Sequence, residues 1–320
     1  MKKYTLILAI LLAAFIISCE DNFNPLGEYS ERYVLNCVVK PDTNLQIATV
    51  SQSYLNNSID PYDNTTDPFI ENVYLRLWYD DEVYIFKDSI LTRENTDRYE
   101  TPVKIYYLDN LDPKPGSELE IEALLPNGRR LNSKTLIPVK PKKVAASSSR
   151  IIPPEETDDI RIQWESDIQG LTYHPKLYVV YNKTENGSRV RKTESVPVEY
   201  YNDGGILRPI YPAASASRNL SIDMDDFNRF MESISEGVEN KRDFEFMFMI
   251  VEVLAFDRNL SLYYASSNTV LDEYSIKLDE ADFTNIDGGF GVFGSFVKGL
   301  FTIKFTTEYL ETLGYRNGFD

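Results

Sequence analysis

The chain has 320 residues, and its 50 aspartates and glutamates outnumber its 33 lysines and arginines, which gives a formal net charge of −17. This acidic balance argues against a nucleic-acid partner, since phosphate binding needs a basic surface, and against electrostatic docking on anionic lipid headgroups. The length suits about two domains, each large enough to bury its own core.

Residues 1–18 predict a secretory signal peptide. Lys2 and Lys3 give a positive start, an uncharged apolar run follows, and a small residue comes just before Cys19. The run is shorter than the roughly 20 residues that a helix needs to span a bilayer. Residues 16–19, Ile-Ile-Ser-Cys, resemble a bacterial lipobox, whose cysteine takes a diacylglyceryl group and becomes the new N-terminus. We therefore expect Cys19 to anchor the chain durably to outer-membrane lipid.

Residues 19–30 predict a lipidated, flexible tether. Glu20 and Asp21 resemble the acidic tag that sends some lipoproteins to the outer face of the membrane, although ordinary solvation explains them as well. If Cys19 carries lipid, Cys37 has no cysteine partner and the mature chain holds no internal disulfide. Cys37 stands in an apolar, strand-like run, so we expect a buried and unreactive thiol.

Residues 31–143 predict an Ig-like β-sandwich. Short runs alternate between apolar and polar side chains, and turn signals recur at a spacing of roughly 8–12 residues. Asn127-Gly128 supplies the positive φ that a hairpin turn needs. The expected hairpins pair residues 73–78 with 83–86, and residues 119–125 with 130–137.

Residues 144–320 predict a second β-rich domain with one or two short helices. The clearest helix lies near residues 223–236, where apolar side chains fall at helical spacing and Ser221 or Asp223 can cap the start. The other expected elements are a solvated basic linker at 140–143, strands at 160–164, 177–181, 244–256 and 290–305, a long loop at 202–220, and helical turns at 260–265 and 307–313.

The sequence offers few residues for catalysis. His174 is the only histidine, and it stands in a Tyr-His-Pro stretch that predicts a turn entering a strand, with no nucleophile motif, so we expect it at the surface or rim. A multi-histidine zinc site is therefore excluded. Asp158-Asp159 and the acidic run 223–226 could contact calcium, but neither spells an EF-hand loop, and a solvated turn and a helix cap explain them better. We expect no catalytic residue, no metal and no cofactor.

Residues 288–294 form a glycine-rich stretch, Gly-Gly-Phe-Gly-Val-Phe-Gly. No Gly-Lys-Ser or Gly-Lys-Thr follows, and no helix is expected to begin there. The stretch therefore fits neither a phosphate-binding loop nor a dinucleotide-binding fingerprint. Glycines between apolar residues suit a bulge or a close crossing of strands, and we expect that structural role.

Four stretches in chain order resemble a known family. They are the lipobox, residues 121–128 (Ile-Glu-Ala-Leu-Leu-Pro-Asn-Gly), residues 135–138 (Thr-Leu-Ile-Pro) and residues 285–294 (Asn-Ile-Asp-Gly-Gly-Phe-Gly-Val-Phe-Gly). Together they resemble the Bacteroidota outer-membrane lipoproteins catalogued as domain of unknown function 4249. The resemblance implies an N-terminal Ig-like sandwich, a second β-rich domain and a role beside a TonB-dependent transporter. It supplies no catalytic residues.

From these features we expect a non-enzymatic, lipid-anchored protein of the outer membrane, exposed at the surface, that assists a nutrient transporter and binds a small molecule, glycan or peptide. Tyr200, Tyr201 and Tyr211 could contact such a ligand, although edge packing explains them equally well. Asp88-Ser89-Ile90 resembles an O-glycan acceptor site of such bacteria. Two alternatives stay open: a carboxylate-dependent hydrolase of the glycosidase type, and a structural or adhesive surface protein.

Overall fold

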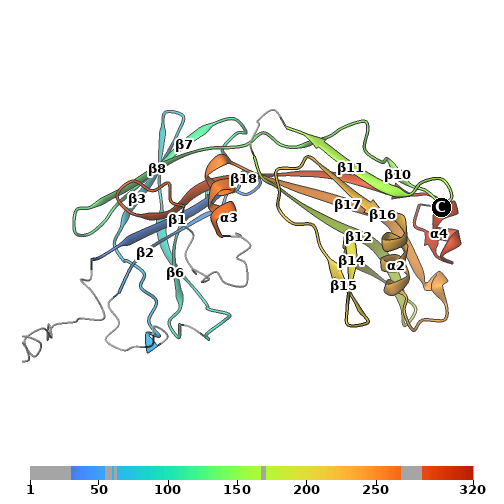
Figure 1. The fold of residues 1–320 in the computed structure, drawn as a ribbon. Helices are drawn as coiled ribbons and strands as arrows, with labels where there is room; N and C mark the ends of the chain where they lie inside the picture. The colour runs from blue at the N-terminus through green and yellow to red at the C-terminus, as the bar shows by residue number, and fades with distance from the viewer. Residues whose placement is uncertain are drawn as a thin grey trace, which may run out of the picture.

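The computed structural model describes residues 30–54, 60, 63–97, 99–166, 171–267 and 283–319. The expected signal peptide, Cys19 and the tether up to residue 29 lie outside these residues. The fold is mainly β, as the sequence predicts, with several sheets and a few short helices, and Figure 1 shows it as two lobes. Within the described ranges, no helix combines the length and apolar character needed to cross a membrane.

The N-terminal lobe is a sandwich of two sheets. Both expected hairpins form in it, and Asp80 and Gly128 take the positive φ that their turns need. One sheet holds β1 (Tyr33–Val39), β2 (Gln46–Gln52), β6 (Val103–Leu108) and β5 (Lys87–Leu91), and the other holds β4 (Glu82–Ile85), β3 (Tyr74–Tyr79), β7 (Glu118–Leu124) and β8 (Arg130–Leu136), each in spatial order.

Alternating side chains fill the space between these two sheets. Along β1 every second residue is buried, which places Leu35 and Cys37 in the core. Leu77 of β3 and Ile121 of β7 enter the same core from the other sheet. Because burying one such aliphatic side chain stabilises a fold by about 1.5–3 kcal/mol, the alternation fixes which face of each strand points inward.

The C-terminal lobe combines a long-stranded sheet with a smaller sheet and helices. The long sheet holds β13 (Ser188–Ser195), β12 (Tyr173–Glu185), β17 (Phe244–Phe256) and part of β18 (Phe290–Phe305), with β10 (Arg150–Ile151) paired to β18 and β19 (Arg316–Asn317) paired to β17. The small sheet holds β16 (Asn219–Asp223), β11 (Asp159–Glu165) and β9 (Lys142–Lys143), and β14 (Glu199–Asp203) with β15 (Ile206–Ile210) forms a separate hairpin. The helices are α2 (Met224–Ile234), α3 (Arg258–Ser267), α4 (Thr307–Thr312) and the short 3₁₀ helix η2 (Lys241–Asp243).

Helix α2 begins where the sequence places it. A carboxylate oxygen of Asp223 accepts hydrogen bonds from the backbone amides of Asp225 at 2.8 Å and Asp226 at 3.4 Å. Asp223 therefore caps the first turn and satisfies amides that have no partner within the helix. Phe227 on the buried side of α2 stacks against aromatic rings of β18 and α4, which confirms the expected core role of the apolar stripe.

Strand β18 belongs to both lobes, and Figure 1 shows it running from one into the other. Its first half pairs in parallel with β1, up to Ser295 opposite Val39. Its second half, from Phe296 to Lys304, pairs antiparallel with β17. The sequence predicted Gly-interrupted strands within residues 144–320, whereas the structure has one continuous strand that completes the N-terminal sheet. The predicted division at residue 143 therefore does not separate the strands of the two lobes.

The glycine-rich stretch lies where β18 passes close to other backbones. A Cβ atom on Gly291 would lie 2.2 Å from the carbonyl oxygen of Leu35, and one on Gly288 would lie 2.4 Å from that of Arg130. Both glycines also have positive φ, +107° and +83°. The expected close crossing of strands is confirmed, because any side chain at these positions would collide with a main-chain oxygen.

Asn285 fixes the same crossing with its side chain. Its Oδ1 accepts from the amide of Phe293 at 3.0 Å, and its Nδ2 donates to the Phe293 carbonyl at 2.8 Å and to Ser133 Oγ at 2.8 Å. The Ser133 hydroxyl in turn donates to the Asn285 carbonyl at 2.7 Å. These bonds tie β8, an edge strand of one sheet, to β18 of the other.

Two expected connections are strands in the structure. Residues 202–220, predicted as a long loop, include the end of β14, all of β15 and the start of β16. Gly204 and Gly205 both adopt positive φ and make the two-residue turn between β14 and β15. The expected linker at residues 140–143 ends in β9, where Lys142 and Lys143 pair with β11. Both segments look like loops in the sequence because they carry few buried side chains.

Candidate binding site

The β14–β15 hairpin projects from the C-terminal lobe in Figure 1. Several of its apolar side chains are exposed. Tyr201 is 46 % exposed, Ile206 62 % and Ile210 38 %. The register pairs Asp203 with Ile206 and Glu199 with Ile210, so the three apolar residues share one side of the hairpin. We call this side, formed by Glu199, Tyr201, Asp203, Ile206, Arg208 and Ile210, the outer face.

Part of the opposite side attaches the hairpin to the lobe, whereas Leu207 on that side is 49 % exposed. Val198 and Tyr200 pack against the buried core, and the guanidinium of Arg229 on α2 lies 5.4 Å from the centre of the Tyr200 ring. These contacts matter because an isolated two-stranded hairpin is only marginally stable in water. Of the three tyrosines expected to contact a ligand, Tyr201 and Tyr211 are exposed, whereas Tyr200 packs inward.

Two of the three charged side chains on the outer face form an ion pair. Arg208 Nε lies 2.6 Å from a carboxylate oxygen of Asp203, and both side chains are about half exposed. Such a surface ion pair contributes little to stability. A tyrosine ring flanked by aliphatic side chains and paired charges suits the apolar face of a sugar ring, a peptide or a protein surface.

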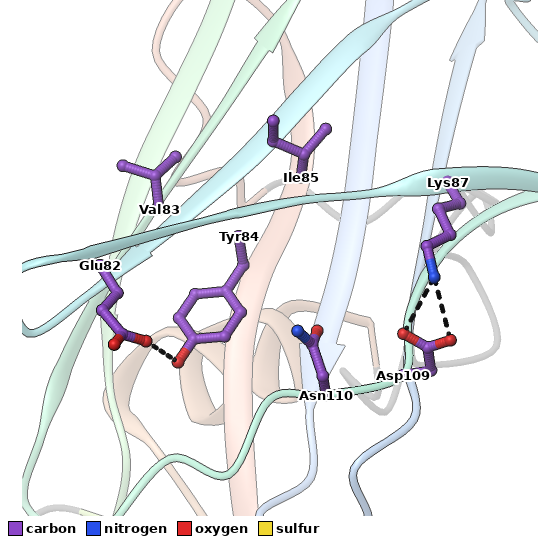
Figure 2. Close-up of a pocket in the computed structure, with 7 residues that line it drawn as sticks. All are labelled: Glu82, Val83, Tyr84, Ile85, Lys87, Asp109 and Asn110. Atoms are coloured by element: carbon purple, nitrogen blue, oxygen red, sulfur yellow. Dashed lines mark hydrogen bonds and ion pairs between the residues drawn. The ribbon is translucent and has the colours of Figure 1, made fainter.

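A second surface feature is a hollow of about 460 Å³ at one edge of the N-terminal lobe, shown in Figure 2. The Tyr84 hydroxyl donates to Glu82 at 2.7 Å, and Lys87 forms an ion pair with Asp109 at 3.1 Å. The hydrogen bond to Glu82 raises the pKa of Tyr84 to about 12, so the phenol stays protonated at neutral pH. The remaining lining residues are Val83, Ile85 and Asn110.

A third hollow, of about 290 Å³, lies at the junction of the lobes and borders Asp257. This carboxylate is 3 % exposed, and it accepts hydrogen bonds from the amides of Leu260 at 2.8 Å and Ser295 at 3.2 Å and from the Thr135 hydroxyl. Burial raises the pKa of Asp257 above its usual range. Its partners belong to α3, β18 and β8, so the carboxylate serves to hold the junction together.

His174 lies within β12, opposite Leu254 of β17, rather than in the turn expected from the sequence. Partial burial, together with the nearby charge of Lys176, lowers its pKa. The strand continues through Pro175 because β13 pairs with β12 only from Tyr178 onward and the bridge to Ser215 is made by Tyr173, so no ladder bond needs an amide at Pro175.

Two other residues singled out from the sequence, Asp159 and Cys37, have structural roles. Asp159 begins β11 rather than a solvated turn; Ser221 and Arg161 bond its carboxylate at 2.6 and 3.0 Å and lower its pKa. Cys37 is 2 % exposed and burial raises its pKa to about 12, which confirms an unreactive thiol. No group of three or more His, Cys, Asp and Glu side chains is placed to hold a metal ion in the described ranges.

Sequence reasoning missed the hollow beside β4. One signal was present in the sequence: Val83-Tyr84-Ile85-Phe86 is apolar on both sides of the strand, whereas a strand with one face in water alternates apolar and polar residues. Ser89 of the O-glycan-like triplet is partly exposed on the edge strand β5 and lines a different hollow, together with Phe69 and Tyr106. Its modification stays a prediction.

Comparisons with known proteins add no assignment: no protein-family model matches the chain, and no match to a curated protein was found. The resemblance to domain of unknown function 4249 therefore stays a prediction. The same is true of the lipid anchor, because Cys19 lies outside the described residues.

Proposed function

We propose that the chain is a non-enzymatic lipoprotein, held at the outer membrane by lipid on Cys19, that binds a ligand or partner for a TonB-dependent nutrient transporter. The outer face of the hairpin carries this proposal. Isolated exposed apolar residues are ordinary on protein surfaces, but three on one side of a projecting hairpin favour an interaction surface. The acidic composition supports anchoring by lipid, since anionic headgroups would repel the body of the protein.

Co-isolation from membranes tests this function. The full chain, tagged at its C-terminus, is purified from detergent-solubilised outer membranes, and the proteins that accompany it are identified by mass spectrometry. We expect a TonB-dependent transporter to accompany the wild-type chain, and its yield to fall when Tyr201→Ser and Ile206→Ser are combined. Leu300→Ser is the matched control, because Leu300 is 54 % exposed on β18, away from the hairpin.

Two outcomes contradict the proposed function. A wild-type chain that always isolates alone would remove the transporter partner. Cleavage of a glycan by the purified chain, abolished by replacing a pair of carboxylates, would instead favour the hydrolase.

A further inference from the structure

Strand β4 has an open edge. It stands at the end of the sheet β4-β3-β7-β8, and among the described strands only β3 pairs with it. An unpaired edge presents free main-chain donors and acceptors, to which another extended chain can add as a strand. Proteins commonly protect such edges with lysine, proline or a bulge.

The hairpin geometry shows which groups of β4 face the open side. Tyr79 and Glu82 flank the two-residue turn, and such flanking residues exchange both hydrogen bonds. Bonded and unbonded pairs then alternate along an antiparallel ladder. The amide of Phe86, four residues after Glu82, donates to the Leu75 carbonyl at 3.0 Å, in keeping with this alternation. The N–H and C=O groups of Val83 and Ile85 therefore point away from β3.

The two sides of β4 carry different kinds of side chain. Figure 2 shows Val83 and Ile85 on one side of the strand, and Glu82 and Tyr84 on the other. Val83 and Ile85 are each 51 % exposed. They stand opposite Trp78 and Arg76 of β3, and the Arg76 guanidinium lies over the Trp78 ring at 4.7 Å. On the first side, Val83, Ile85 and Trp78 thus form a partly exposed apolar platform, bordered by the ion pair of Arg76 with Glu122.

The second side is acidic. Glu82 and Asp109 line the hollow, and Asp80 and Asp81 form the adjoining exposed turn. Lys87 is the one cation among the described residues that line the hollow, and Asp109 already pairs with it. A segment that carried carboxylates here would meet like charge, whereas lysine or arginine would meet complementary charge.

We infer that the open edge of β4 accepts an extended segment of another polypeptide as an additional strand, and that this segment alternates apolar and basic side chains. The main chain of the segment bonds to Val83 and Ile85, its apolar side chains cover the platform, and its basic side chains lie on the acidic side, beside Glu82. This inference rests on the proposed function, in which the chain binds a partner, and it specifies the chemistry of that partner.

Synthetic peptides provide the probe. An eight-residue peptide that alternates valine and lysine is titrated into the full chain in detergent micelles, and binding is followed by calorimetry. Two comparison peptides are used: one with the same residues in two blocks, and one that alternates valine and glutamate. We expect measurable binding of the alternating valine–lysine peptide alone. Equal binding of the blocked peptide would show simple charge attraction and overturn the inference, and so would no binding of any peptide.

Val83→Pro tests the main-chain bonds directly. It removes an amide that points to the open side and leaves the β3 ladder intact, a position where edge strands tolerate proline. We expect affinity for the valine–lysine peptide to fall about tenfold. The matched control is Thr193→Pro on β13, the edge strand of the long sheet in the C-terminal lobe. Thr193 is exposed, and the same alternation points its amide outward. Unchanged affinity in Val83→Pro, or an equal loss in both variants, would contradict the inference.

A charge variant covers the case in which Val83→Pro unfolds. Glu82→Lys keeps the main chain and reverses the charge beside the edge, so we expect it to abolish preference for lysine over glutamate peptides. Retained preference would overturn the assignment of a basic partner. The co-isolation experiment and these titrations test separate claims. If a transporter accompanies Val83→Pro as well as the wild-type chain, the proposed function stands, but β4 is not the surface that binds the transporter.

Discussion

Gly291 has no room for a side chain, and this makes it the sharpest residue-scale test of the strand crossing. We expect Gly291→Ala to lower the free energy of unfolding by about 3 kcal/mol or more, because a Cβ would meet the Leu35 carbonyl oxygen in an already left-handed backbone. Urea unfolding followed by circular dichroism measures the change.

Gly205→Ala is the matched control for Gly291→Ala. Gly205 has a similar φ of +94°, but a Cβ added to it would meet no atom within 4 Å. Only backbone strain remains there, so we expect a cost of about 1 kcal/mol. Equal costs for the two variants would show that β18 and β1 are not in close contact at Gly291.

Asp257 should make stability depend on pH in a recognisable direction. Burial raises the pKa of this carboxyl in the folded state above its ordinary value of 3.8. The folded state then holds its proton more tightly than the unfolded state, so this contribution is present at low pH and is lost as the pH rises through the folded-state pKa. We expect Asp257→Asn to gain stability relative to wild type as the pH rises from about 4 toward neutrality.

Asp159→Asn is the control of opposite sign, since hydrogen bonds from Ser221 and Arg161 lower the pKa of Asp159. Its contribution is lost as the pH falls. Urea unfolding of both variants across the acid range separates the two effects. A wild-type minus Asp257→Asn difference that does not change with pH would contradict the buried-carboxylate account.

Residues with local partners were predictable from the sequence. Asp223 bonds amides two and three residues away, and Cys37 stands in an apolar run, so neighbouring sequence contains the information. Asn285 was not predictable as a structural clamp, because its partner Ser133 is 152 residues distant in the chain. Only the fold brings them together.

Among the elements, the β14–β15 hairpin allows a binding role to be distinguished from a packing role, because substitutions on its two sides should differ in their effect on stability. Tyr201→Ser and Ile206→Ser act on exposed side chains, so we expect each to change the free energy of unfolding by less than about 0.5 kcal/mol. Tyr200→Ala should cost about 1–2 kcal/mol, because it removes packing against the core and the contact with Arg229. Denaturant unfolding measures all three.

An outcome in which Tyr201→Ser destabilises the chain as much as Tyr200→Ala would mean that the outer face is buried against something in the folded protein. The hairpin would then be a packing element, which is the alternative explanation for the tyrosines.

Helices and strands with a strong hydrophobic periodicity were predictable from the sequence, whereas the strands that pair with one another were not. The expected strand at residues 244–256 matches β17, and the expected helix near 223–236 contains α2. The hairpin was missed because its strands are almost wholly exposed and give no alternation of buried residues. The two different neighbours of β18 could not be predicted from alternation, which says which face of a strand is buried but not which strand lies beside it.

At the scale of the whole molecule, we expect all membrane attachment to rest on one residue. The body is acidic, so anionic headgroups give it no electrostatic attraction to the membrane. We therefore expect Cys19→Ser to move the chain from the membrane fraction to the soluble or mislocalised fraction, as measured by cell fractionation and immunoblotting. Cys37→Ser is the control and should leave the distribution unchanged, because that thiol is buried in the sandwich. Retention of Cys19→Ser in the outer membrane would place the anchor elsewhere.

Photo-crosslinking in intact cells tests the central claim most directly, because it reports what touches the hairpin in place. A photoreactive phenylalanine analogue replaces Tyr201 in one strain and Leu300 in another, and crosslinked partners are identified by mass spectrometry. We predict that the probe at Tyr201 captures a TonB-dependent transporter and that the probe at Leu300 does not. No crosslink at Tyr201, or the same partner captured from both positions, would contradict a transporter-associated role for the hairpin.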